Sequence, residues 1–241
     1  FTGSFAKAYG GDPSQELKYE DTSRSIWEYM DNESWLRENI AEDTPHITFS
    51  NGRNDSQIGW PQAWKFAQAL IDTQRPFTFL WSMGGHGVRP QFPGANDRKA
   101  HPEMDFRKDQ SVPAFTNGGL DQSLGSSPEA APDKGRINYW YLWEANSVVD
   151  TDDSWEMTIF LPDNAPEDST QVNLTPRRLQ EFSVQAGVTY DWTNKQDGEV
   201  IQQGTVTADE HGLVTLRSVQ ISKERNRISL STSSNDSEPE E

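Results

Sequence analysis

The sequence predicts an α/β part with parallel strands, followed by an all-β antiparallel sandwich. The first observation is a strand, turn, helix, strand order between residues 46 and 87, which is typical of a parallel βαβ unit. The second is a series of short strand candidates at regular intervals from Ile137 onward. Between them, residues 88–136 are rich in Pro, Gly, Asn, Asp and Ser and have no clear periodicity.

The α/β part is predicted from its apolar spacing. A helix with apolar residues three to five positions apart is expected to begin near Ser25. A short buried strand follows at residues 46–50, and a turn then leads to a helix at 61–73. Pro61 lies in the first turn of this helix, where a backbone N–H would have no acceptor within the helix. A second apolar strand is expected at 77–82.

We therefore expect four segments along the chain. Residues 1–87 form the α/β unit, and residues 88–136 form a long linker or decorating loop, because so long a connection is uncommon inside a compact domain. Residues 137–231 form an immunoglobulin-like β-sandwich, and residues 232–241 form a disordered acidic tail. The sandwich strands are expected at 137–144, 154–161, 170–175, 180–184, 188–193, 198–206, 213–221 and 226–231.

Composition narrows the classes of partner. The net charge of −17 repels nucleic acid and anionic membranes at a distance, so neither is an expected partner. No apolar run reaches the roughly 18 residues that a membrane span needs. Cysteine is absent, which excludes disulfides and a cysteine nucleophile. No metal or cofactor is expected, because the histidines outside the Gly-rich loop do not have ligand spacing: His46, His101 and His211.

Each of the two predicted parallel strands is followed by a residue that can take part in proton transfer. Asp55 lies in the turn after the first strand, and His86 lies in the Gly-rich loop after the second. Because the carboxyl ends of parallel strands meet at one edge of a sheet, we expect the two side chains to lie close together. In a hydrolytic triad the histidine moves a proton and the aspartate fixes the imidazole tautomer. Asp55 and His86 are therefore the candidate catalytic residues.

Three nearby residues are candidates for substrate binding. Trp60 stands five positions after Asp55, where it either lines a pocket or packs under the following helix, and packing is the favoured interpretation. Arg53 either binds an anionic group or stabilises the turn, with the turn favoured. Met83 precedes the histidine loop and is a weaker candidate for a substrate contact.

Residues 49–63 and 79–87 resemble the end of an α/β-hydrolase domain of the esterase and prolyl-oligopeptidase-like kind. The resemblance implies that Asp55 and His86 are the acid and base of a Ser-His-Asp triad. The nucleophile motif of that family, Gly-x-Ser-x-Gly, does not occur in this sequence. We therefore expect the chain to be the C-terminal portion of such an enzyme, incomplete alone, with an N-terminal portion as the partner that supplies the serine and the oxyanion hole.

The function expected from this resemblance is hydrolysis of carboxylic esters, sugar-linked or polymer-linked esters among them. One alternative is a serine peptidase of the prolyl-oligopeptidase type, which would use the same acid and base. Another is a non-catalytic carbohydrate-binding protein whose aromatic strand stacks on sugar rings. The second half resembles modules appended to exported bacterial hydrolases, so a secreted or periplasmic location is expected. The aromatic strand consists of Tyr139, Trp140, Tyr141 and Trp143.

Overall fold

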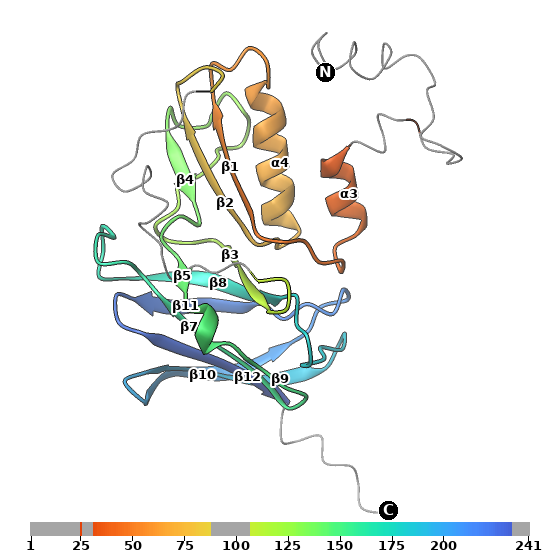
Figure 1. Ribbon diagram of the computed structural model, residues 1–241, viewed down its shortest axis with the longest axis vertical. Helices are drawn as coiled ribbons and strands as arrows, with labels where there is room; N and C mark the ends of the chain where they lie inside the picture. The colour runs from red at the N-terminus through yellow and green to blue at the C-terminus, as the bar shows by residue number, and fades with distance from the viewer. Residues whose placement is uncertain (1–24, 26–30, 88–106, 233–241) are drawn as a thin grey trace, which may run out of the picture.

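The computed structural model describes Ser25 and residues 31–87 and 107–232, which form a small helix-covered sheet above a β-sandwich (Figure 1). The described part of the chain contains two α-helices, and both lie beside the small sheet. None of the described helices is long and apolar enough to cross a membrane.

The small sheet has the strand order β1-β2-β4. Strand β1 (Ile47–Gly52) runs parallel to β2 (Phe77–Ser82), with Ile47 opposite Phe77. Strand β4 (Gly135–Ile137) pairs with the other side of β2 and runs antiparallel to it. β1 is therefore an edge strand of this sheet.

Helix α4 (Trp60–Asp72) covers one face of the small sheet. Alternate residues of β2 point to this face, because side chains alternate along a strand. Trp60 stacks on Phe79, with ring centroids 6.1 Å apart. The shorter α3 (Asn32–Glu38) packs beside α4. The buried core here consists of Leu36, Trp60, Ala63, Ala67, Ala69, Leu70, Phe77, Phe79, Trp81, Leu124, Ala131 and Ile137.

The sandwich consists of two antiparallel sheets, ordered β10-β9-β12-β7-β5 and β11-β8-β3, with β6 paired to β7. The first sheet contains β5 (Leu142–Trp143), β6 (Val149–Asp150), β7 (Ser154–Phe160), β9 (Thr189–Gln196), β10 (Glu199–Thr207) and β12 (Asn226–Thr232). The second contains β3 (Val112–Thr116), β8 (Ser169–Arg177) and β11 (Leu216–Ser222). A short 3-10 helix, Ala145–Ser147, lies between β5 and β6.

The parallel α/β-hydrolase sheet expected for the first part of the chain was wrong. The described residues form mainly antiparallel sheets with two short helices, and β1 and β2 are the one parallel pair among them. The physical reason is that β4 returns antiparallel along β2 and occupies the edge where a further parallel strand would pair. The antiparallel sandwich that the strand spacing predicted is confirmed.

Some expected elements differ locally. Residues 137–144 do not form one strand, because Asn138 has a φ of 57° and turns the chain between β4 and β5. Residues 180–184 form a loop whose amides at 180–182 donate to the Asp150 carboxylate instead of to a strand. The expected helix start at 26–30 and the tail at 233–241 lie outside the described residues.

Residues 107–136 of the range expected to be a linker contribute to both layers, and residues 88–106 lie outside the described residues. β3 pairs with β8 in the sandwich, and Gly135 and Arg136 of β4 pair with β2 in the small sheet. Asn138, just after β4, donates from its side-chain amide to the carbonyls of Phe77 and Phe115. One buried amide thus joins a strand of the small sheet to a strand of the sandwich.

A buried arginine also joins the two layers. The Arg177 side chain on β8 is 1% exposed and lies 3.1 Å from the Asp43 carboxylate. Its guanidinium also donates to the carbonyls of Ile40 and Glu42, just after α3. A planar guanidinium suits this role because its donors spread over several acceptors at once.

Replacing this arginine should therefore weaken the whole fold. We expect Arg177→Ala to lower the free energy of unfolding by roughly 3 kcal/mol, since the carbonyls and Asp43 lose their buried donor. Guanidinium unfolding followed by tryptophan fluorescence measures this. Lys195→Ala, an exposed lysine on β9, is the control, with an expected change of at most about 0.5 kcal/mol. Equal small effects of both variants would contradict the role given to Arg177.

A second prediction concerns His46, which packs against Trp143 of the sandwich with ring centroids 5.5 Å apart. Burial lowers the pKa of His46 to about 4, below the ordinary 6.5, so the folded state favours the neutral ring. The stability that the neutral His46 ring contributes is present above pH 6.5 and is lost as the pH falls from 6.5 towards 4. The free energy of unfolding falls by up to about 3 kcal/mol over this range. The pKa of Asp121, raised to about 7 by burial, acts in the opposite direction.

The measurement is therefore the difference in unfolding free energy between the native chain and His46→Asn at several pH values. This difference isolates His46, because Asp121 is present in both proteins. We expect it to shrink as the pH falls from 7 to 4. A difference that stays constant over this range would show that His46 does not titrate with a depressed pKa.

Candidate functional site

The two candidate catalytic residues lie together. The Nδ1 of His86 is 3.0 Å from Oδ2 of Asp55. An ionised carboxylate can only accept, so Nδ1 carries the hydrogen of this bond, and in the neutral ring Nε2 is then the nitrogen with the lone pair. The His86 side chain is 46% exposed and that of Asp55 is 5% exposed. Among the described residues, none is hydrogen-bonded to Nε2 of His86.

Two loops at one end of the parallel pair position these side chains. The backbone N–H of Arg53 donates to Ser82 O at 2.7 Å, and that of Asn54 donates to Gly84 O at 3.1 Å. Gly52 permits this approach, because a Cβ at its position would lie 2.1 Å from Gly84 O. The parallel register and one glycine therefore bring the aspartate loop against the histidine loop.

The Asp55 carboxylate is held in its ionised form. Its Oδ1 accepts the backbone N–H groups of Gln57 at 2.8 Å and Ile58 at 3.0 Å. The amide of Ile58, then that of Gln57 and the His86 ring, hold the pKa of Asp55 below its usual value. One oxygen is thus fixed by the turn, and the other is left to orient the imidazole.

The pair faces a pocket of about 610 Å³. The pocket opens along the edge strand β1 and the first two turns of α4. Aromatic and aliphatic side chains, Phe49, Ile58 and Phe66 among them, supply much of its wall. The full lining consists of Phe49, Ser50, Asn51, Gly52, Asp55, Ile58, Gln62, Ala63, Phe66, Gly85, His86 and Gly87.

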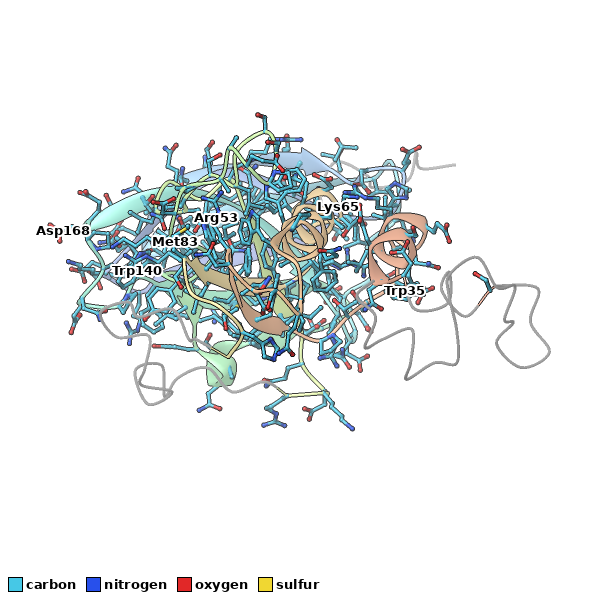
Figure 2. All side chains as sticks on the ribbon, turned by 90° about the horizontal axis from the view of Figure 1, so that it is seen from above. Trp35, Arg53, Lys65, Met83, Trp140 and Asp168 are labelled. Carbon is cyan, nitrogen blue, oxygen red and sulfur yellow. The ribbon has the colours of Figure 1, made fainter. Side chains whose placement is uncertain are left out.

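The three predicted substrate-binding residues lie outside this lining. Trp60 is buried, and its indole N–H donates to Pro128 O at 2.7 Å. Arg53 reaches the same loop and donates to Ala131 O at 2.7 Å. Met83 is 45% exposed, and it lies near Arg53 in Figure 2, in agreement with the bonds between their two loops.

Sequence reasoning missed the apolar pocket wall. Ile58 offered a signal, because it is an apolar residue inside the polar turn that follows Asp55, and it is 49% exposed. Phe49 and Phe66 gave no such signal, since each fits the apolar face of a strand or helix. Their ring contact at 5.3 Å brings β1 and α4 together beside the pocket.

The described residues supply neither a hydroxyl bonded to His86 nor a group of metal ligands. No serine or threonine hydroxyl there hydrogen-bonds to His86, although Ser50 lines the same pocket. No group of three His, Asp or Glu side chains in this part of the chain could hold a metal ion.

Comparison with known proteins gives no relative: no family model, no curated protein and no solved structure matches the chain. The identification of the chain as the C-terminal portion of an α/β hydrolase was wrong, because the described fold is mostly β-sheet and nothing in these comparisons supports that family. The contact between Asp55 and His86 does not depend on that identification, since it is a distance within this chain.

The Gly52 contact gives a direct test of the site geometry. We expect Gly52→Ala to separate the two loops and break the bond between His86 and Asp55, because the added Cβ meets Gly84 O. The strongly deshielded Nδ1 proton of an Asp-bound imidazole, observed by NMR, should disappear. Gly85→Ala is the control, because its Cβ would lie 3.7 Å from the nearest atom. A retained signal in Gly52→Ala would contradict this account.

Proposed function

We propose that this chain supplies the general base and its orienting carboxylate to a serine-type hydrolase that cleaves carboxylic esters. One observation carries the proposal: Nδ1 of His86 is bonded to the Asp55 carboxylate, His86 lines a pocket, and no described residue is bonded to its Nε2. A histidine in this state can accept a proton at Nε2 and later return it.

In the proposed reaction, Nε2 of His86 removes the proton from a serine hydroxyl as its oxygen attacks the ester carbonyl. The bond to the leaving alcohol then breaks, and His86 returns the proton to that alcohol. A water molecule then attacks the acyl-enzyme while His86 takes its proton, and His86 returns that proton to the serine oxygen as the carboxylic acid is released. Asp55 stabilises the imidazolium in both halves and fixes its orientation.

The serine is proposed to come from a partner segment outside the described residues. Support for this comes from the lack of any hydroxyl bonded to Nε2 of His86 within the described ranges. The same partner would supply the donors that stabilise the oxyanion. Without that partner, we expect the described unit to be inert towards esters.

The pocket wall favours an acyl group as the part of the substrate next to His86. Phe49, Ile58 and Phe66 offer apolar contacts, whereas a peptide bond would bring further amide groups that need partners. A sugar-linked or polymer-linked alcohol would lie on the open side of the pocket. The peptidase alternative becomes one outcome of the substrate comparison below.

The test uses the native assembly, isolated from the source organism through an affinity tag on this chain. A fluorophosphonate reagent should label one serine, and p-nitrophenyl butyrate should be hydrolysed faster than the matching p-nitroanilide. We expect His86→Gln to lower ester turnover by about 10²–10⁴-fold. Asp55→Asn should cause a loss of similar size, because the imidazole loses its correct tautomer.

Two controls separate this chemistry from general damage. Ser56→Ala removes an exposed hydroxyl of the turn after Asp55, outside the pocket lining, and His211→Gln removes an exposed histidine of the sandwich. Neither should change turnover by more than about twofold. The proposal would be refuted if the fluorophosphonate labels no serine of the native assembly, or if ester turnover survives His86→Gln. Faster cleavage of the anilide would favour a peptidase.

A further inference from the structure

The sandwich contains a second cavity, of about 480 Å³, away from the pair of Asp55 and His86. It lies where the edge strands β10 and β11 of the two sheets approach the turn between α4 and β2. Its lining combines an indole, aliphatic groups, hydroxyls and charged groups. The lining residues that carry the argument are Gln74, Trp192, Gly204, Thr215 and Arg217.

Trp192 is the aromatic group of this groove. It lies on β9, is partly buried, and packs against the sandwich core. Among the described residues its indole N–H has no hydrogen-bond acceptor. Four other tryptophans, in contrast, donate this hydrogen to a carbonyl or hydroxyl oxygen: Trp60, Trp64, Trp81 and Trp155. Trp192 therefore presents both an apolar ring and an unused donor to the groove.

Gly204 keeps the indole uncovered. It pairs directly with Trp192 across the β9–β10 ladder. A Cβ at this position would lie 3.2 Å from the indole nitrogen, so any larger side chain would cover that edge of the ring. On the other side, β11 loses its regular register between Leu216 and Val219, where Ser218 has a φ of 52°. Next to the groove the two sheets are bridged, because Gln202 of β10 donates to Ser218 O and accepts from the backbone N–H of Gln220 on β11.

Gln74 provides a fixed polar group at the rim. Its φ of 51° is uncommon for a residue with a side chain, and it directs the amide towards the sandwich. There Oε1 accepts from the hydroxyls of Thr215 at 2.7 Å and Thr175 at 3.1 Å. The amide nitrogen has no partner within the described ranges. Arg217 is exposed and forms no ion pair there, so its guanidinium is also free to donate.

We propose that this groove binds a neutral carbohydrate. A sugar ring has an apolar face of C–H groups that packs on an indole, and it carries hydroxyls that accept from Trp192, Gln74 and Arg217. Small-ligand sites typically combine such an apolar surface with a few fixed polar groups. The net charge of −17 opposes an anionic polymer at a distance, which favours an uncharged chain.

This groove differs from the site that the aromatic sequence run suggested. Tyr139, Trp140, Tyr141 and Trp143 are all buried, at 6% exposure or less, so they cannot stack on a ligand. The groove also stands independently of the ester-hydrolase proposal, because none of its lining residues borders the Asp55 and His86 pocket.

The experiment titrates the full chain with cellohexaose, xylohexaose and chitohexaose while recording the indole N–H signals by NMR. The Trp192 signal is assigned from its absence in Trp192→Phe. We expect it to shift saturably with at least one of the three hexasaccharides. Gly204→Val leaves Trp192 in place but covers its nitrogen, and should weaken binding at least tenfold. Valine suits a strand, so this variant should fold.

Gln203→Ala, on the same strand but outside the groove, is the matched control and should bind as the native chain does. His86→Gln should also bind normally, which separates this proposal from the hydrolase. The proposal is overturned if none of the three sugars at 10 mM shifts the Trp192 signal. It is equally overturned if Gly204→Val binds as tightly as the native chain, or if polygalacturonate alone binds.

Discussion

The parallel pairing of β1 with β2 is the constraint on which the candidate active site depends. Parallel strands end at the same edge of a sheet, so the loops that follow them must meet. Gly52 lets them meet at backbone distance, and two backbone hydrogen bonds and the Asn54 side-chain amide then join the loops. The contact between Asp55 and His86 is then a consequence of strand direction and of one missing Cβ.

A second constraint joins this small sheet to the sandwich. Buried polar groups, and not only apolar surface, connect the layers: Arg177 donates to the segment after α3, and Asn138 donates to one strand of each layer. Such groups need acceptors at defined positions, since a buried donor without a partner is costly. They therefore specify one relative placement of the two layers more strictly than apolar packing would. Gln74 extends the same pattern to the rim of the second groove.

The sequence predicted those features of the fold that depend on residues close together along the chain. Local periodicity and chain order predicted a strand at 46–50, found at Ile47–Gly52, a strand at 77–82 and a helix at 61–73, found at Trp60–Asp72. They also predicted that Asp55 and His86 lie close together. The antiparallel return of β4 was not predicted, because it depends on contacts with a strand more than 50 residues earlier. This return is also why the α/β-hydrolase interpretation failed: two parallel strands and a helix do not define the rest of a sheet.

The two candidate sites lie at opposite ends of β2. His86 follows its last residue closely, and Gln74 precedes its first residue by three positions. Six strand residues span about 20 Å, so one small molecule cannot occupy both sites. A polymer could, and binding at the groove would then raise its effective concentration at the pocket without any new contact there. The two proposals therefore combine for a polymeric ester, whereas for a small ester the groove would add nothing to turnover.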